Sequence, residues 1–104
     1  MVGSALLKLL SQRGYVNILK RTHSELDLIN QKKTLEFFKS ESPEYVFLLA
    51  AKVGGINANN KYRGQFIYEN LMIQNNVIHS SHLSSVKKLI FIGSACIYPK
   101  LAKQ

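Results

Sequence analysis

Residues 45–60 read YVFLLAAKVGGINANN, an unbroken apolar run that passes directly into small and polar residues. The run Tyr45–Ala50 is typical of a strand that is covered on both faces in a parallel sheet. Residues 51–60 show neither a helical nor a strand period, so we expect a loop there. In parallel α/β sheets, ligands bind beyond the carboxyl ends of the strands. This junction therefore indicates an α/β fold with a ligand site where the run ends.

The rest of the chain alternates between helix and strand patterns around this junction. Gly14 suits the end of a first helix, Asn30 can cap a second helix, and Pro43 bars the extension of that helix. A third, long helix is predicted from apolar residues that recur at helical spacing: Ile67, Leu71, Val77 and Ile78. The predicted helices span about residues 2–13, 31–39 and 64–84, and the predicted strands span residues 15–20, 45–50 and 89–92.

The predicted strands are separated by helices and not by hairpin turns, so the connections are crossovers and the sheet is parallel. A Rossmann-type, doubly wound domain opens with a strand that feeds a glycine-rich turn before the first helix. Here the chain opens with MVGS, which we interpret as the end of that turn. Residues 1–104 are therefore predicted to form a partial, doubly wound Rossmann domain that lacks its first strand. In the expected strand order, the lost strand lies between residues 15–20 and residues 89–92 and leaves a gap.

The chain of 104 residues fits one small domain, and its formal charge of +8 raises the question of an acidic partner. Lysine and arginine occur at most in pairs such as Lys20-Arg21 and Lys32-Lys33, and no row of aromatic residues accompanies them. We therefore do not expect a nucleic-acid partner. A solvated basic face is the simplest interpretation, and a nucleotide phosphate is the alternative anion.

Three further classes of protein are disfavoured by short features of the sequence. Cys96 is the single cysteine, so the chain forms no internal disulfide and a reducing, cytoplasmic location is expected. The opening segment MVGSALLKLL contains Lys8, is too short for a membrane span and lacks the marks of a signal peptide, so we expect no membrane contact. His79 and His82 share a predicted helix face without a third ligand, so no metal site is predicted.

Two strings carry a resemblance to a known family: LAAKVGGINANN at residues 49–60 and GSACIYPKLAKQ at residues 93–104. Together they resemble the GDP-L-fucose synthase family of the extended short-chain dehydrogenases/reductases. The resemblance also covers MVGS at residues 1–4 and RTHSELDL at residues 21–28. Family members epimerise C3 and C5 of GDP-4-keto-6-deoxy-D-mannose and reduce it with NADPH to GDP-L-fucose. The resemblance therefore implies NADP as the cofactor, a GDP-sugar as the substrate and a homodimer.

The resemblance also implies where the cofactor binds. Met1, Val2 and Gly3 would end the pyrophosphate turn, although Gly3 also fits an ordinary glycine at a helix start. Asp27 matches an acidic residue near the adenine. The segment beside the adenosine comprises His23, Ser24, Glu25, Leu26, Asp27 and Leu28, and the nicotinamide side comprises Ile92, Gly93, Ser94 and Ala95.

Ser94 and Cys96 are the candidate catalytic residues. A hydroxyl near the keto oxygen stabilises the negative charge that develops during hydride transfer, and the resemblance assigns this role to Ser94. Epimerisation next to a carbonyl requires proton transfer on both faces of the sugar, and the resemblance assigns one such transfer to Cys96. From the residues alone, a turn cap is the commoner role for a serine placed like Ser94, and a small apolar filler is the commoner role for a cysteine placed like Cys96.

Basic residues follow the predicted strand at residues 15–20, where a cation accommodates the 2′-phosphate of NADP. Lys20, Arg21 and His23 therefore favour NADP over NAD, although His23 also fits a solvated loop residue. Members of the family often carry arginine at the position of His23. The Tyr-x-x-x-Lys pair of the superfamily does not occur in the sequence, so residues 1–104 alone are expected to be inactive. The alternative interpretation is a noncatalytic module that binds a nucleotide or a partner chain.

Overall fold

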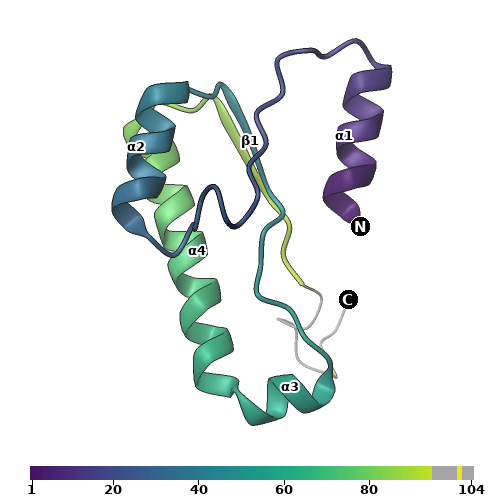
Figure 1. Ribbon diagram of the computed structural model, residues 1–104, viewed down its shortest axis with the longest axis vertical. Coiled ribbons are helices and arrows are strands. Elements are labelled where there is room, and N and C mark those ends of the chain that lie inside the picture. Colours follow the sequence, from purple (N-terminus) through teal and green to yellow (C-terminus); the bar gives the residue numbers. More distant parts are fainter. Residues whose placement is uncertain (95–100, 102–104) are drawn as a thin grey trace.

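A computed structural model describes residues 1–94 and residue 101 of the chain. In chain order the described elements are α1 (Val2–Gln12), α2 (Gln31–Glu41), β1 (Tyr45–Leu48), α3 (Ile56–Lys61), α4 (Arg63–Leu83) and β2 (Lys88–Phe91). Figure 1 shows α2 and α4 on one side of the two strands and α1 on the other. The architecture is α/β, as the sequence predicts.

The two strands form a parallel pair. Tyr45 lies opposite Lys88, and Leu48 lies opposite Phe91. The Ile92 amide donates to the Leu48 carbonyl at 3.3 Å and extends the ladder past the end of β2. Helices α3 and α4 make the crossover from β1 to β2. The residues after β1 and the residues after β2 therefore leave the same edge of the sheet, which confirms the expected common edge.

The prediction of a strand at residues 15–20 is wrong. These residues form no ladder, and Tyr15 and Val16 are 62% and 94% exposed. A strand needs a neighbour to pair with its N–H and C=O groups, and local β propensity does not provide that neighbour. The predicted strand order is also wrong, because β1 is the direct neighbour of β2 and no gap separates them.

The hydrophobic core lies between the strands and the helices α2 and α4. Its buried apolar residues are Phe38 from α2, Leu48 from β1 and Val77 from α4. Asn30 caps α2 as predicted, since its Oδ1 accepts from the Lys33 amide at 3.0 Å. The core therefore joins one strand to two helices that are far apart in the sequence.

Helix α4 lies where the long helix was predicted, which confirms that prediction. Of the four apolar residues that indicated it, Val77 is buried, and Ile67, Leu71 and Ile78 are 62%, 47% and 44% exposed. The buried residues of α4 are Asn76, Val77, Ser80 and Ser81. Small and amide side chains allow close approach of the neighbouring chain, and a pattern based on apolar residues does not detect such a face.

Helix α1 is covered less than the sequence predicts. Gly14 has φ 84° just after the helix, a left-handed conformation that glycine adopts without strain. Among the described residues, α1 buries none, and Tyr45 and Phe47 of β1 are 61% and 41% exposed. The prediction that β1 is covered on both faces is therefore wrong, because α2 and α4 cover one face and α1 does not seal the other.

The loop predicted at residues 51–60 contains α3 in its second half, which corrects the prediction. Residues 51–55 form the expected loop. The Asn59 side chain then donates to the Gly54 carbonyl at 3.0 Å. A Cβ on Gly54 would lie 2.9 Å from Phe66 Cζ, so the absence of a side chain lets this turn pack directly against α4.

Candidate functional site

Three segments of the predicted site meet at the carboxyl edge of the sheet. The amino end of α1 and the carboxyl ends of β1 and β2 point toward the same end of the molecule (Figure 1). Helix α1 approaches the chain just after β1, because a Cβ on Gly3 would lie 3.7 Å from Leu49 Cδ1. The edge is therefore bounded by the start of α1 and by the residues that follow each strand.

The first turn of α1 carries no acidic side chain. Met1 is the N-cap without a side-chain cap, and Met1 and Val2 are exposed. The first amides of a helix have no intrahelical acceptor and attract anions. This end therefore fits a phosphate group, while the assignment of Met1, Val2 and Gly3 to the pyrophosphate stays a prediction.

Residues 22–25 form a turn that Glu25 closes. Its Oε2 accepts from the amide and from the hydroxyl of Thr22, each at 2.7 Å. The backbone hydrogen bond from Thr22 is the main reason that the pKa of Glu25 is lowered. Ser24 adds a hydroxyl contact with Thr22 at 3.0 Å. Glu25 and Ser24, two of the predicted adenosine residues, thus shape the loop through Thr22.

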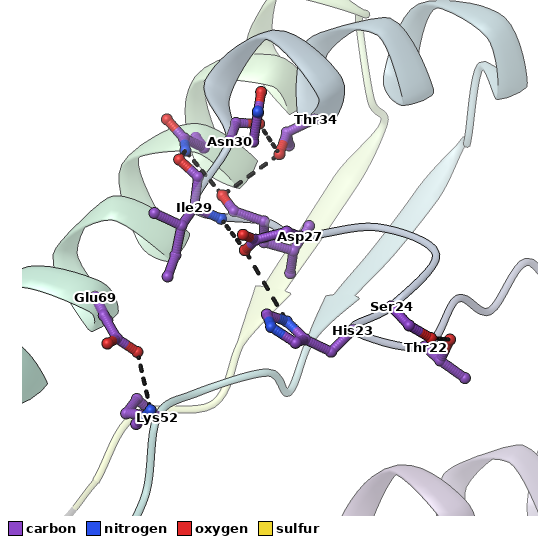
Figure 2. Close-up of polar contacts among 11 residues, drawn as sticks. Thr22, His23, Ser24, Asp27, Ile29, Asn30, Thr34, Lys52 and Glu69 are labelled. Atoms are coloured by element: carbon purple, nitrogen blue, oxygen red, sulfur yellow. Dashed lines mark hydrogen bonds and ion pairs between the residues drawn. The ribbon is translucent and has the colours of Figure 1, made fainter.

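His23 and Asp27 face each other across this turn (Figure 2). His23 Nδ1 lies 4.0 Å from Asp27 Oδ1, and the same oxygen accepts from the Ile29 amide at 3.0 Å. The backbone therefore holds the carboxylate in place. The His23 side chain is 83% exposed and the Asp27 side chain 45%. The structure thus brings two of the predicted adenosine residues into one polar pair.

The end of the same loop is fastened to α4 and α2 (Figure 2). Asn76 is 4% exposed, and its Nδ2 donates to the carbonyls of Leu28 and Ile29 at 2.8 and 2.9 Å. Thr34 is fully buried, and its hydroxyl donates to the Asn30 carbonyl at 2.9 Å. Neither of these two anchors was predicted from the sequence. The one signal for Asn76 is an amide directly before the apolar Val77 in the predicted long helix.

Arg21 is bound to α2. Its Nη2 lies 2.7 Å from Glu41 Oε1, and its guanidinium carbon lies 5.3 Å from the centroid of the Phe37 ring. A carboxylate and an aromatic face together hold a guanidinium in one place. All three cations predicted to accommodate the 2′-phosphate are exposed, and Arg21 is held by α2.

Asn70 clamps the loop after β1 to α4. Its Oδ1 accepts from the Lys52 amide at 2.8 Å, and its Nδ2 donates to the carbonyls of Lys52 and Phe66 at 3.0 and 2.9 Å. Lys52 Nζ also lies 3.3 Å from Glu69 Oε2 (Figure 2). The hydrogen bond from Gln65 and then the contact with Lys52 lower the pKa of Glu69. The loop that follows β1 is thus fixed through its backbone and through a side chain.

The residues after β2 reach the shared edge. Ile92, Gly93 and Ser94 are exposed there, directly beside the exit of β1. Ala95 and Cys96 lie outside the described residues. The roles of Ser94 and Cys96 in the reaction therefore stay predictions, and so does the assignment of residues 92–95 to the nicotinamide.

The described part of the chain contains neither a cluster of metal ligands nor a helix suited to span a membrane. Within residues 1–94 and 101, no three histidine, cysteine, aspartate or glutamate side chains gather closely enough to hold a metal ion. None of the helices in the same residues combines the length and the apolar character needed to cross a bilayer.

Comparison with known proteins identifies relatives along the whole chain. The family described as the NAD dependent epimerase/dehydratase family matches residues 1–104. GDP-L-fucose synthase from Escherichia coli and GDP-L-fucose synthase 1 from Arabidopsis thaliana are each 55% identical over 104 residues, which are 100% of this chain and 32% of either relative. The solved structure of a GDP-mannoheptose C4 reductase from Campylobacter jejuni with NADP bound is 55% identical with a TM-score of 0.92, and the match covers 97% of this chain and 32% of that one. The chain thus spans about a third of the length of the relatives it matches, and the likeness confirms the predicted partial Rossmann-type fold.

Proposed function

The chain belongs to the NAD dependent epimerase/dehydratase family, and from this premise we propose that it supplies the cofactor-binding part of an NADPH-dependent enzyme acting on GDP-sugars. The observation that carries the proposal is the shared edge, where the amino end of α1 lies beside the residues that follow β1 and β2. Relatives named GDP-L-fucose synthase and GDP-mannoheptose C4 reductase with NADP bound support the substrate class and the cofactor.

In this proposal the cofactor lies along this edge, against the residues predicted from the sequence. The amino end of α1, at Met1, Val2 and Gly3, binds the pyrophosphate. The loop at residues 23–28 takes the adenosine, with the Asp27 carboxylate held by the backbone for a polar contact. Residues 92–95 take the nicotinamide. The fixed loops on either side favour this arrangement because they require little reordering when a dinucleotide binds.

The proposed reaction is the epimerisation and reduction of GDP-4-keto-6-deoxy-D-mannose to GDP-L-fucose. NADPH, when bound, supplies the hydride that reduces the keto group. Ser94 donates a hydrogen bond to the keto oxygen and stabilises the charge that develops there. Cys96 transfers a proton at a carbon next to the carbonyl. The sequence has no Tyr-x-x-x-Lys pair, so we expect residues 1–104 alone not to turn over substrate.

A GDP-linked 4-keto heptose is the second candidate substrate. The Campylobacter jejuni relative, named a GDP-mannoheptose C4 reductase, is as similar in sequence to this chain as the Escherichia coli GDP-L-fucose synthase is. The two substrates differ at the carbon beyond C5 and share the C4 keto group that Ser94 would contact. The edge of the sheet therefore supports reduction at C4 of either sugar. An activity assay with both sugars distinguishes between them.

A chimeric enzyme tests the proposal. Residues 1–104 replace the matched part of the Escherichia coli relative, and NADPH oxidation is followed with each of the two keto sugars. We expect turnover with the 6-deoxy sugar, and we expect Ser94→Ala to lower kcat about a hundredfold with little change in NADPH binding. Cys96→Ser is expected to slow deuterium incorporation at C3 or C5 far more than it weakens NADPH binding. A folded chimera that oxidises NADPH with neither sugar would overturn the proposal.

We further propose that a polypeptide containing this chain forms a homodimer in the cytoplasm. The exposed apolar residues Ile67, Leu71 and Ile78 on α4 support self-association, because a helix face of this kind is stabilised by burial. The single cysteine, Cys96, supports a reducing location. Sedimentation of the chimera before and after Leu71→Glu tests the dimer, which should dissociate, and cell fractionation tests the location.

A further inference from the structure

His79 and His82 form a pair of exposed imidazoles near the carboxyl end of α4. They lie three positions apart in one helix, which places their side chains next to each other on the same helix face. Together with Asn75 and Ile78 they line an open surface hollow of about 460 Å³. Among the described residues, neither imidazole has a hydrogen-bond or ion-pair partner. The ring nitrogens of both histidines are therefore available to bind another group.

The surroundings of this histidine pair favour a cation. None of the four residues that line the hollow carries a fixed charge, so none of them repels a metal ion. His82 lies in the last turn of α4, where the carbonyl groups at the helix end give a partial negative charge. The helix itself therefore stabilises a positive ion at this position.

Two imidazoles select a particular class of ion. Neutral histidine is a common ligand of zinc, copper and nickel ions, whereas calcium and magnesium take oxygen ligands. Zinc in proteins is almost always held by four ligands in a tetrahedral arrangement. Within residues 1–94 and 101, no third histidine, cysteine, aspartate or glutamate joins the pair. One copy of the chain therefore supplies only half of a zinc site.

A second copy of the chain fits as the source of the other half. Ile78 lies in the same hollow and is 44% exposed, and Leu71, two turns before it, is 47% exposed. Spacings of four, three and four positions place one stripe of residues along this helix face: Leu71, Asn75, Ile78 and His82. A twofold axis brings the same residues of two copies together. Two α4 helices that meet along this stripe would therefore place four imidazoles near each other.

We propose that His79 and His82 bind a divalent transition-metal ion such as Zn²⁺, and that two copies of the chain share one ion through four imidazoles. Burial of Ile78 in both copies removes apolar surface from water and adds to the metal coordination. Self-association then depends on the metal concentration, because the ion binds the paired form in preference to the single chain. Since α4 ends just before β2 begins, the site lies toward the amino edge of the sheet, away from the proposed cofactor edge. The inference goes beyond the proposed reaction and does not depend on it.

The test uses the chain of residues 1–104 without a polyhistidine tag, at about pH 7.5, where histidine is largely neutral. Isothermal titration with Zn²⁺ should give about 0.5 ions per chain, because four imidazoles from two copies complete one tetrahedral shell. In sedimentation velocity, Zn²⁺ should lower the dissociation constant of the dimer at least about tenfold, and EDTA should reverse this change. Binding of one ion per chain with no change in self-association would refute the shared site.

His79→Ala and His82→Ala identify the ligands. Both positions are exposed, so each variant should keep the wild-type circular dichroism spectrum. Each should weaken Zn²⁺ binding at least about a hundredfold, because a group that only orients a metal ligand already contributes about ten- to a hundredfold.

His23→Ala is the matched control, since it removes the remaining histidine of the chain from the loop before α2. It should keep the Zn²⁺ affinity and the Zn²⁺-dependent association of wild type. Zn²⁺ binding that survives in both His79→Ala and His82→Ala, or that His23→Ala abolishes, would overturn the inference and leave the proposed cofactor site unaffected.

Discussion

Replacing Asn76 by alanine is expected to release the loop at residues 26–29 from α4. In the wild-type chain, Asn76 Nδ2 donates to the carbonyls of Leu28 and Ile29 at 2.8 and 2.9 Å, and the residue is 4% exposed. A hydrogen bond of this kind contributes about 1 kcal/mol net to stability, so the two together contribute about 2 kcal/mol. Carbonyls left buried without a partner would add to the cost. The higher helix propensity of alanine offsets about 0.6 kcal/mol of it.

Asn75→Ala is the matched control for this measurement. Asn75 is the preceding residue of α4 and is exposed, so its replacement gives the same gain in helix propensity without removing the clamp. Unfolding in urea is followed by circular dichroism and by tyrosine fluorescence, since the chain has no tryptophan. We expect Asn76→Ala to have a free energy of unfolding about 2 kcal/mol below that of Asn75→Ala, with the same dependence on urea. A difference below about 0.5 kcal/mol would show that the amide does not fasten the loop.

Three further outcomes follow from the described contacts. Phe38→Ala removes a core ring and should lower the free energy of unfolding by about 3 kcal/mol in the same urea assay, and a loss below about 1 kcal/mol would contradict the core described above. The hydrogen bonds from Thr22 lower the pKa of Glu25 in the folded chain. The ionised Glu25 carboxylate therefore stabilises the folded chain above the pKa that Glu25 has in the unfolded chain, and this stabilisation is lost as the pH falls through the pKa of Glu25 in the folded chain. Wild type should therefore lose more stability than Glu25→Gln between about pH 5 and about pH 3, and parallel losses would refute this. Asn70→Ala should speed hydrogen exchange at the Lys52 amide about tenfold, as measured by NMR, and unchanged exchange would rule out the clamp.

Much of the fold can be predicted from single residues that act locally. Gly14 ends α1, Asn30 caps α2, and the apolar run at residues 45–50 contains β1. The strand predicted at residues 15–20 fails because pairing depends on a neighbour that local sequence does not specify. The buried face of α4 was missed because Asn76 is recognised as a core residue only when its two carbonyl partners are known.

The candidate site could be predicted in outline from the sequence but not in its polar contacts. The exits of β1 and β2 meet as expected, since parallel strands end at the same edge. The pairing of Arg21 with Glu41 could not be predicted, because it joins two elements across twenty positions of the chain. That pairing shows that Arg21, one of the three cations predicted from the sequence, is held by α2.

The side-chain amides of Asn70 and Asn76 on α4 also limit the insertions and deletions that this helix can tolerate. Asn70 holds the loop after β1, and Asn76 holds the loop before α2. One inserted or deleted residue turns all that follows in a helix by about 100° and shifts it by about 1.5 Å. An insertion or deletion of one residue between these positions would therefore rotate the side-chain amide of Asn70 or of Asn76 away from the backbone groups that it binds. Across homologous sequences, we expect the residues between Asn70 and Asn76 to vary in identity while their number stays constant.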